Sequence, residues 1–562
     1  MTDTTPPIPS ADTPHREEMF PTLTAVQIAR IAVHGRKRPV QQGEVLVKAG
    51  ERTTRFFVVI AGQIEIVQPK GEVEEIVAVF RPGMFTGEVT MLSGRRGLAQ
   101  IRASAAGEVI EVDREHLLSL VQTDSELSDI FMRAFIFRRT ELIAQERGDV
   151  LLIGSIHCAG TLRVKEFLTR NGHPYRYIDL DQESIVQDLL DHFRVAPEDV
   201  PVLICRGELV LRDPTNQEIA VCLGFNDAID QTHVRDLVIV GAGPAGLAAA
   251  VYGASEGLDV LLLEANSPGG QAGSSSKIEN YLGFPTGISG QELAARAYTQ
   301  AEKFGAQLLI ARGARQLRCN PKPYALEVEN GPAIPARAII IATGAEYRRL
   351  SIENLAQFEG AGVYYGATFI EAQLCSGEEV IVVGGGNSAG QAAVFLAQTA
   401  RSVQMIVRSD GLANTMSRYL IRRIEQTPNI VVRIETELIG LEGDEVRNHL
   451  KRVRWRNNRT GDIETHDIPH VFVMAGAVPN TSWLDGCLGL DAKGFIKTGP
   501  DLSADDLVAA QWPLARAPHL LETSRPGVFA VGDVRGGNLK RVASAVGEGA
   551  IAVAFVHRVL HE

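Results

Sequence analysis

Two glycine-rich turns in the C-terminal half of the chain have the spacing of a dinucleotide phosphate cradle. Each follows a short apolar run, 237–240 or 380–383, and precedes a helix-like segment. In this pattern the first glycine makes a tight turn, the second admits a pyrophosphate, and the last small residue lets helix and strand pack closely. The helix N-terminus then offers free N–H groups to the phosphates. The expected cradle residues are Gly241, Gly243, Pro244, Ala245 and Gly246, and Gly384, Gly386, Asn387, Ser388 and Ala389.

The residue that ends the next apolar run indicates which nucleotide each cradle takes. After the first cradle, the run 260–263 ends in Glu264, at the spacing of an acid that binds ribose hydroxyls. After the second, the run 403–407 ends in Arg408. An arginine there can pair with a 2′-phosphate, which an acid would repel. We therefore expect NADPH rather than NADH; the alternative is that Arg408 is a solvated surface charge.

From about Val234 to Leu560 the chain resembles the thioredoxin reductase branch of the pyridine nucleotide–disulfide oxidoreductases. The resemblance implies FAD in the first cradle, with Asp533 at the ribityl chain and residues 541–543 at the isoalloxazine. It also implies a homodimer and a hinge rotation. At the second cradle, Ser409 and Ala413 replace two arginines of the family pattern. The further FAD residues that the resemblance implies are Gly270, Gln271, Asn280, Thr343, Gly344, Asp533, Arg541, Val542 and Ala543.

The redox-active Cys-Ala-Thr-Cys of that family is absent, and Gly366-Ala367-Thr368-Phe369 stands in its place. Without two thiols this segment cannot form and release a disulfide. Tyr364, Tyr365, Gly366 and Phe369 are expected at the flavin face, the alternative being that the aromatic rings are core residues. Electrons would then leave to dioxygen, to a protein carrier (thioredoxin, ferredoxin or flavodoxin), or to another thiol of the chain. Cys375 is expected to be a buried structural thiol.

Residues 148–230 alternate as β-α-β-α-β and resemble a thioredoxin or glutaredoxin fold. Cys158 falls at the nucleophile position of those families, at a helix N-terminus that would lower its pKa. Val200-Pro201 fits their cis-proline, whereas Thr161 occupies the resolving position and excludes a local disulfide. Two alternatives remain open: Cys158 is a catalytic monothiol, or the unit is a docking domain that has lost its chemistry.

Residues 20–147 read as short strands with glycine turns followed by a helix, and they resemble a cyclic nucleotide-binding domain. Gly87 and Glu88 match the start of its phosphate-binding cassette, where the glutamate accepts from the ribose 2′-hydroxyl. The arginine expected for the cyclic phosphate falls on Gly97, so Arg96 is the candidate, with Arg95 beside it. The alternative is a barrel that has lost this ligand and serves dimerisation or docking.

Together these segments predict an α/β protein. Two Rossmann-like domains are preceded by a β-jelly-roll cyclic-nucleotide-binding-like domain and a small thioredoxin-like α/β domain. The expected divisions are a disordered tail (1–19), the barrel (20–147), the thioredoxin-like unit (148–230), the FAD domain (231–350 with 473–562) and the NADPH domain (351–472). The leading hypothesis is an FAD-dependent NADPH oxidoreductase. The alternative is a redox sensor in which a ligand at the barrel regulates the flavoprotein.

Composition narrows the class of partner. The 562 residues carry a net charge of −12, which argues against nucleic acid, since phosphate binding needs clustered positive charge. No helix-turn-helix follows the barrel, which weighs against a transcription factor. No leader and no apolar run of about 20 residues are evident, so we expect neither export nor a membrane partner. The six cysteines include no Cys-x-x-Cys, so no metal site is expected. We predict a cytoplasmic protein.

Overall fold

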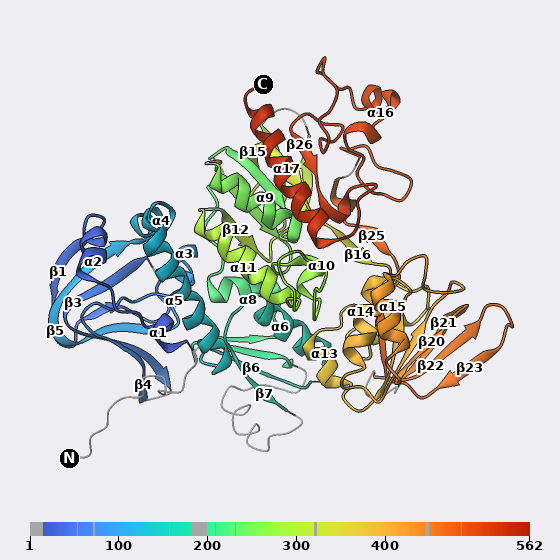
Figure 1. The fold of residues 1–562 in the computed structure, drawn as a ribbon, viewed down its shortest axis with the longest axis horizontal. Helices are drawn as coiled ribbons and strands as arrows, with labels where there is room; N and C mark the ends of the chain where they lie inside the picture. Colours follow the sequence, from blue (N-terminus) through green and yellow to red (C-terminus); the bar gives the residue numbers. More distant parts are fainter. Residues whose placement is uncertain are drawn as a thin grey trace.

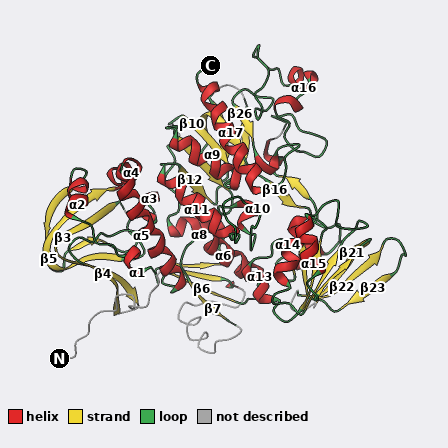
Figure 2. Cartoon of the chain, in the orientation of Figure 1, coloured by secondary structure: helices red, strands yellow, loops and turns green. Residues whose placement is uncertain are grey.

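The computed structural model describes residues 15–52, 54–70, 73–156, 158–180, 199–207, 209–230, 232–319, 323–443, 449–484 and 486–562. Figure 1 shows a β-rich unit at one side (blue), a small α/β unit beside it (teal), and two nucleotide folds that form the rest of the molecule. The secondary-structure colours of Figure 2 show the helices gathered in the centre, with strands at both flanks. The small unit, called the middle unit below, contacts both neighbours: Arg95 of the β-rich unit packs on its Phe225, and its Arg170 donates to the Gly270 carbonyl.

The N-terminal unit is a five-stranded antiparallel sheet with helices packed on it. Its strand order is β1-β5-β3-β4, and β2 pairs with β5. Of these, β3 is the longest, and its register against β5 shifts between Val59 and Ile64. The elements are α1 (Arg16–Met19), α2 (Ala25–Ala32), β1 (Arg36–Val40), β2 (Val45–Val47), β3 (Arg55–Lys70), β4 (Val73–Phe80), α3 (Thr90–Ser93), β5 (Gln100–Asp113), α4 (Arg114–Thr123) and α5 (Ser125–Ala144).

The middle unit has a four-stranded sheet in the order β7-β6-β8-β9. β6 and β7 are parallel and the other pairs antiparallel, and the Val200–Pro201 bond is cis, as the resemblance to thioredoxin implies. The helix expected at 184–193 lies outside the described residues. A disulfide joins Cys205 to Cys222, which local spacing did not predict. The elements are β6 (Val150–Gly154), α6 (Ala159–Arg170), β7 (Arg176–Asp179), β8 (Val202–Cys205), β9 (Leu209–Arg212) and α8 (Asn216–Leu223).

The FAD unit has a seven-stranded sheet in the order β12-β11-β10-β15-β14-β13, and β26 pairs with β15. Its central parallel strands are buried on both faces, so they read as nearly continuous apolar runs. A second disulfide joins Cys319 to Cys487. The elements are β10 (Arg235–Val240), α9 (Pro244–Ser255), β11 (Val260–Glu264), α10 (Gly270–Gly273), α11 (Gly290–Lys303), β12 (Gln307–Ile310), β13 (Ala314–Arg318), β14 (Tyr324–Val328), β15 (Ile334–Ile341), α16 (Ala504–Ala509), β26 (Val528–Ala530), α17 (Val542–Leu560) and 3-10 turns at Ser482–Leu484, Gly499–Asp501 and Gly532–Val534.

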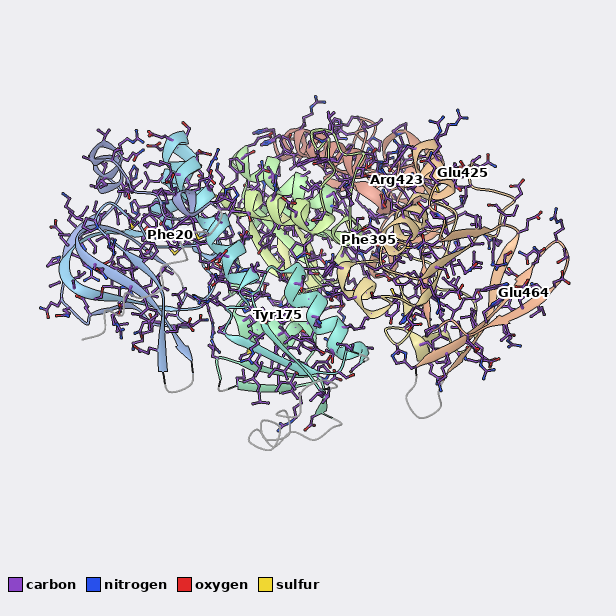
Figure 3. The ribbon with its side chains drawn as sticks, turned by 60° about the horizontal axis from the view of Figure 1, so that its bottom comes forward. Phe20, Tyr175, Phe395, Arg423, Glu425 and Glu464 are labelled. Carbon is purple, nitrogen blue, oxygen red and sulfur yellow. A yellow bond between two sulfur atoms is a disulfide. The ribbon has the colours of Figure 1, made fainter. Side chains whose placement is uncertain are left out.

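The second nucleotide unit has a five-stranded parallel sheet, β17-β24-β18-β19-β20, and a three-stranded sheet, β21-β22-β23. The short antiparallel pair of β16 and β25 forms the two connections to the FAD unit. Arg423, labelled in Figure 3, also crosses to the FAD unit, where it pairs with Glu279 at 2.6 Å. The elements are β16 (Ala345–Tyr347), α12 (Leu355–Phe358), β17 (Val363–Tyr364), α13 (Phe369–Leu374), β18 (Glu379–Val383), α14 (Asn387–Leu396), β19 (Ser402–Ile406), α15 (Arg418–Glu425), β20 (Ile430–Arg433), β21 (Thr436–Gly443), β22 (Leu450–Asn457), β23 (Ile463–His466), β24 (His470–Val473) and β25 (Ala477–Pro479).

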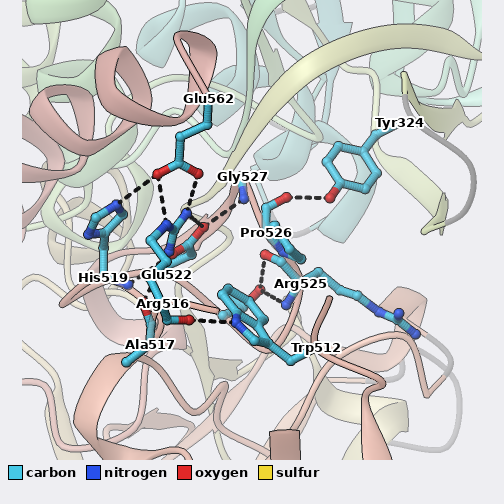
Figure 4. Close-up of polar contacts among 11 residues, drawn as sticks. Tyr324, Trp512, Arg516, Ala517, His519, Glu522, Arg525, Pro526, Gly527 and Glu562 are labelled. Atoms are coloured by element: carbon cyan, nitrogen blue, oxygen red, sulfur yellow. Dashed lines mark hydrogen bonds and ion pairs between the residues drawn. The ribbon is translucent and has the colours of Figure 1, made fainter. Parts of the chain in front are cut away.

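A buried ion pair holds the loop that leads into β26 (Figure 4). Glu522 is fully buried, and its carboxylate accepts from Arg516 at 2.7 Å and from the backbone N–H groups of His519 and Gly527, each at 2.8 Å. Arg516 also pairs with Glu562 at 2.7 Å. This network fixes the approach to β26, and the turn that carries Asp533 follows directly.

Helix α17 corrects one expectation from the sequence. It is 19 residues long with a hydropathy of 1.4, so by length and composition it could cross a membrane. One face of the helix, including Ala545, Ala552 and Val556, lies in the hydrophobic core of the FAD unit. This packing accounts for one face of the helix, since 28% of its most apolar 18-residue window is buried.

Candidate active site

A cavity of about 780 Å³ opens between the FAD unit, the second nucleotide unit and the middle unit. Both cradles reach it, the first through its glycine turn and the second through the start of α14. The structure thus brings together residues predicted for two separate cofactors. Those that line the cavity are Gly241, Gly243, Pro244, Ala245, Glu264, Gly270, Gln271, Asn280, Thr343, Gly344, Tyr364, Tyr365, Gly366, Asn387, Ser388, Asp533, Arg541 and Val542.

The geometry of the first cradle fits a dinucleotide. Gly241 has φ +105°, and a Cβ there would lie 2.4 Å from the Ala342 carbonyl oxygen. A Cβ on Gly246 would lie 1.8 Å from the Gly241 oxygen, so only glycine permits this helix-to-strand contact. Gly243 faces the cavity, with its nearest neighbour 3.9 Å from a Cβ position. The turn is thus closely packed against the strand and helix at Gly241 and Gly246, and open toward the cavity at Gly243, as pyrophosphate binding requires.

Two acidic side chains stand at this cradle. The Glu264 carboxylate accepts from the backbone N–H groups of Ala242 at 2.8 Å and Asn266 at 2.9 Å. Burial raises the pKa of Glu264, and these N–H groups oppose that shift. Burial also raises the pKa of Asp533, which lines the same cavity. In the described ranges, no three His, Cys, Asp or Glu side chains gather to hold a metal ion.

The second cradle has the same construction. Gly384 has φ +142°, and a Cβ there would lie 2.6 Å from the Met474 oxygen. Gly386 precedes α14, and a Cβ on it would meet nothing within 4 Å, so the phosphate position is open. Ala389 is buried at the helix contact. Arg408 is exposed just beyond β19, and within the described part of the chain no acidic side chain pairs with it.

The segment that replaces the dithiol lies partly at the cavity. Gly366 lines it, and so does Tyr364, which also packs on Phe472 in the core, with the ring centroids 5.2 Å apart. Phe369, the first residue of α13, is 69% exposed and is not among the residues that line the cavity, whereas its neighbour Thr368, the N-cap of α13, lines it. The place of Phe369 at the flavin face stays a prediction.

Two parts of the chain match known protein families. Residues 235–549 match the family described as pyridine nucleotide-disulphide oxidoreductase. The chain belongs to this family. Residues 37–124 match the cyclic nucleotide-binding domain.

Among curated relatives, the thioredoxin reductase of Mycolicibacterium smegmatis is 33% identical over 58% of this chain and 97% of its own length. The thioredoxin reductase of Ureaplasma parvum is 32% identical over 57% of this chain and 96% of its own length. The solved thioredoxin reductase of T. acidophilum is 29% identical, covers 58% of this chain and 99% of its own, and superposes with a TM-score of 0.51. The protein is therefore an NADPH-dependent flavoprotein oxidoreductase that uses FAD and NADPH.

The middle unit supplies a wall of this oxidoreductase's cavity, which sequence reasoning missed. Cys158 is the N-cap of α6 and half-buried, and it is not among the lining residues. The residues of α6 that line the cavity are Ala159, Leu162, Arg163, Glu166 and Arg170. No local motif marks them, because the cradle that they face lies far along the chain.

In the cyclic nucleotide-binding domain, the structure places a different arginine beside the predicted acid. Glu88 pairs with Arg139 of α5 at 3.5 Å. The predicted Arg96 instead lies against Gly224 of the middle unit, where a Cβ would meet its Nε at 2.7 Å. Arg95 is 7% exposed, and its guanidinium packs on Phe225 of the middle unit, 4.5 Å from the ring centroid.

Arg95 also reaches the FAD unit. Its guanidinium donates to the hydroxyl of Tyr298 on α11 and lies 5.2 Å from that ring's centroid. Burial raises the pKa of the neighbouring Glu302 carboxyl, and the charge of Arg95 opposes the shift. The cassette is thus in direct contact with the oxidoreductase.

Proposed function

We propose that this oxidoreductase passes hydride from NADPH to FAD and then reduces an acceptor without an active-site dithiol. The observation that carries the proposal is the segment 366–369, which contains no cysteine although its first residue, Gly366, lines the cavity. Bound in the second cradle, NADPH would supply a hydride, and FAD bound in the first would take it up. The chain's own part is to hold the two nucleotides at one cavity.

Cys375 is a poor substitute for the missing thiols. It is fully buried, its thiol donates to the Glu371 carbonyl at 3.3 Å, and burial raises its pKa to about 11. Since the thiolate is the reactive form, such a thiol exchanges slowly at neutral pH. The remaining acceptors are dioxygen, a protein carrier and Cys158.

Anaerobic stopped-flow reduction by NADPH tests the first half of the proposal. The absorbance of oxidised flavin should fall without any thiol reagent. Mixing the reduced protein with dioxygen, thioredoxin, ferredoxin and flavodoxin in turn then identifies the acceptor by which one restores the colour. A flavin that NADPH does not reduce would refute the proposal.

The Cys158→Ser variant tests the thiol route. If Cys158 carries electrons, reoxidation of the reduced flavin slows in this variant, and mass spectrometry of the wild type after peroxide treatment finds Cys158 modified. If the rates are equal and Cys158 is unmodified, the middle unit serves docking alone. Cys375→Ser is the matched control, since the structure gives that thiol no access.

A second candidate function is ligand-responsive regulation, and the Arg95 contact favours it. A ligand that draws Arg95 toward Glu88 would weaken its contact with Tyr298, so binding at the cassette and docking of the FAD unit would be linked. Calorimetry with cyclic AMP and cyclic GMP tests binding, and NADPH turnover with and without the ligand tests coupling. No heat at millimolar ligand would exclude the sensor role.

The Arg95→Met variant separates regulation from binding. It should make turnover independent of a ligand that the wild type senses, because the contact with Tyr298 is lost. Arg81→Met, at an exposed position of the same unit, should respond like the wild type.

We also propose a cytoplasmic homodimer. Fractionation and size-exclusion chromatography test these two points. The two disulfides weigh against a cytoplasmic location, because such bonds persist mainly in oxidising compartments, so fractionation is the deciding test of the first point.

A further inference from the structure

Helix α6 of the middle unit presents one face to the FAD cavity. The lining residues Ala159, Leu162, Arg163, Glu166 and Arg170 recur at spacings of three and four. Such spacing places side chains on a single helical face. Leu162 anchors this face, since it belongs to the hydrophobic cluster that contains Tyr364 and Ala367 of the second nucleotide unit. The middle unit is therefore built into the site.

Arg170, in the last turn of α6, donates hydrogen bonds directly to the FAD cradle. Its Nη2 donates to the Gly270 carbonyl oxygen at 2.8 Å and lies 3.5 Å from that of Pro268. Its Nη1 donates to Glu166 at 3.1 Å, which holds the guanidinium in place. The turn so held carries Gly270, and a Cβ on Gly270 would lie 3.0 Å from the Cα of Gly243. Arg170 thus sets the spacing between the two halves of the cradle.

These contacts satisfy only part of the hydrogen-bonding capacity of the Arg170 guanidinium. The side chain is 16% exposed, and its Nε is buried without a hydrogen-bond partner. The positive charge also lowers the pKa of Glu264, opposing the effect of burial. A buried donor left unpaired is unfavourable, so a polar group of a bound ligand at this position would stabilise the site.

We propose that Arg170 is an FAD-binding residue that the middle unit contributes to the oxidoreductase. It positions the 268–270 turn, and its charge favours the anionic part of FAD in the first cradle. FAD binding and docking of the middle unit are then linked, each strengthening the other. The proposal rests on FAD occupying this cavity, so a wild-type protein that takes up no flavin would refute that assignment instead.

Arg170→Gln in the full-length protein tests the proposal. The apoprotein of each variant is titrated with FAD, following flavin fluorescence, and melted with and without FAD. Loss of a charge-assisted interaction of about 1.5–3 kcal/mol should raise the Kd for FAD roughly 10- to 150-fold. The salt dependence of the Kd should also become shallower, because one buried positive charge is gone.

Arg176→Gln is the matched control in the same unit. Arg176 is exposed on β7 and is not among the residues that line the cavity, so the Kd for FAD in this variant should match that of the wild type. Arg170→Lys keeps the charge but not the planar fork and should fall between Arg170→Gln and the wild type.

The outcomes separate clearly. A Kd for FAD in Arg170→Gln equal to that of the wild type overturns the proposal. If Arg170→Gln does not fold, as judged by circular dichroism, Arg170→Lys decides: a wild-type Kd and salt dependence in that variant would mean that the planar contacts with the turn contribute nothing.

Discussion

Replacing Arg408 with alanine should change which nicotinamide cofactor the protein uses. Arg408 is exposed beyond β19, and within the described residues no acid pairs with it, so its loss should leave folding unaffected. The whole effect then falls on the 2′-phosphate of NADPH. A charge-assisted hydrogen bond contributes about 1.5–3 kcal/mol, and solvent screening favours the lower part of that range. We therefore expect kcat/KM for NADPH to fall roughly 10- to 30-fold, with NADH unaffected.

Stopped-flow flavin reduction with each cofactor measures this ratio directly. Arg401→Ala is the matched control, because Arg401 is also exposed and lies just before the same strand, at the end remote from the cradle. The effect of Arg408→Ala should shrink in high salt, as expected for an exposed charge. An NADPH-to-NADH ratio that stays the same in Arg408→Ala would refute the assignment of Arg408 and leave it a surface charge.

Three further predictions follow from other parts of the structure. Arg516→Met removes the partner of the fully buried Glu522 and should lower the free energy of unfolding by about 3–5 kcal/mol, measured by thermal melting. Adding Glu522→Gln should recover part of that loss, and an unchanged melting temperature in the single variant would contradict the prediction. Because burial raises the pKa of Glu264, this carboxyl takes up a proton above the usual pH range of a glutamate. FAD affinity should therefore weaken as the pH falls through that raised pKa, and Glu264→Gln should flatten the dependence; a parallel curve in the variant would argue against it. Cys375 should resist iodoacetamide at neutral pH in the folded protein and react after denaturation, since its pKa is about 11; rapid labelling of the native form would contradict this.

The sequence predicted the cradles well because their physics is local. A tight turn, an open phosphate position and a close helix contact are each set by one residue, and Gly241, Gly243 and Gly246 meet those demands in turn. The acid at the end of β11 follows from the same strand-to-helix spacing. Cys375 was also predicted to be buried, and it is.

The contacts between units could not be predicted in this way. Arg170 and Arg95 each act on a partner about 100 to 200 residues further along the chain, and neither lies in a motif that names its partner. The position of Phe369 at the flavin face stays a prediction, because the start of α13 determines its direction and the sequence does not show which side of a helix start faces a cavity. Arg96 was predicted by counting positions in the cassette. In the structure, contacts with the middle unit determine where both arginines lie, with Arg96 at Gly224 and Arg95 at Phe225.

The order of the chain also imposes an order of assembly. The sheet that holds the flavin is completed by β26, which pairs with β15 although 186 residues separate Ile341 and Val528 in number. On the ribosome, the nicotinamide-binding lobe emerges whole while its neighbour still lacks an edge strand and its last helix. FAD is thus expected to bind only near the end of synthesis, and nascent chains stalled before β26 should lack flavin absorbance.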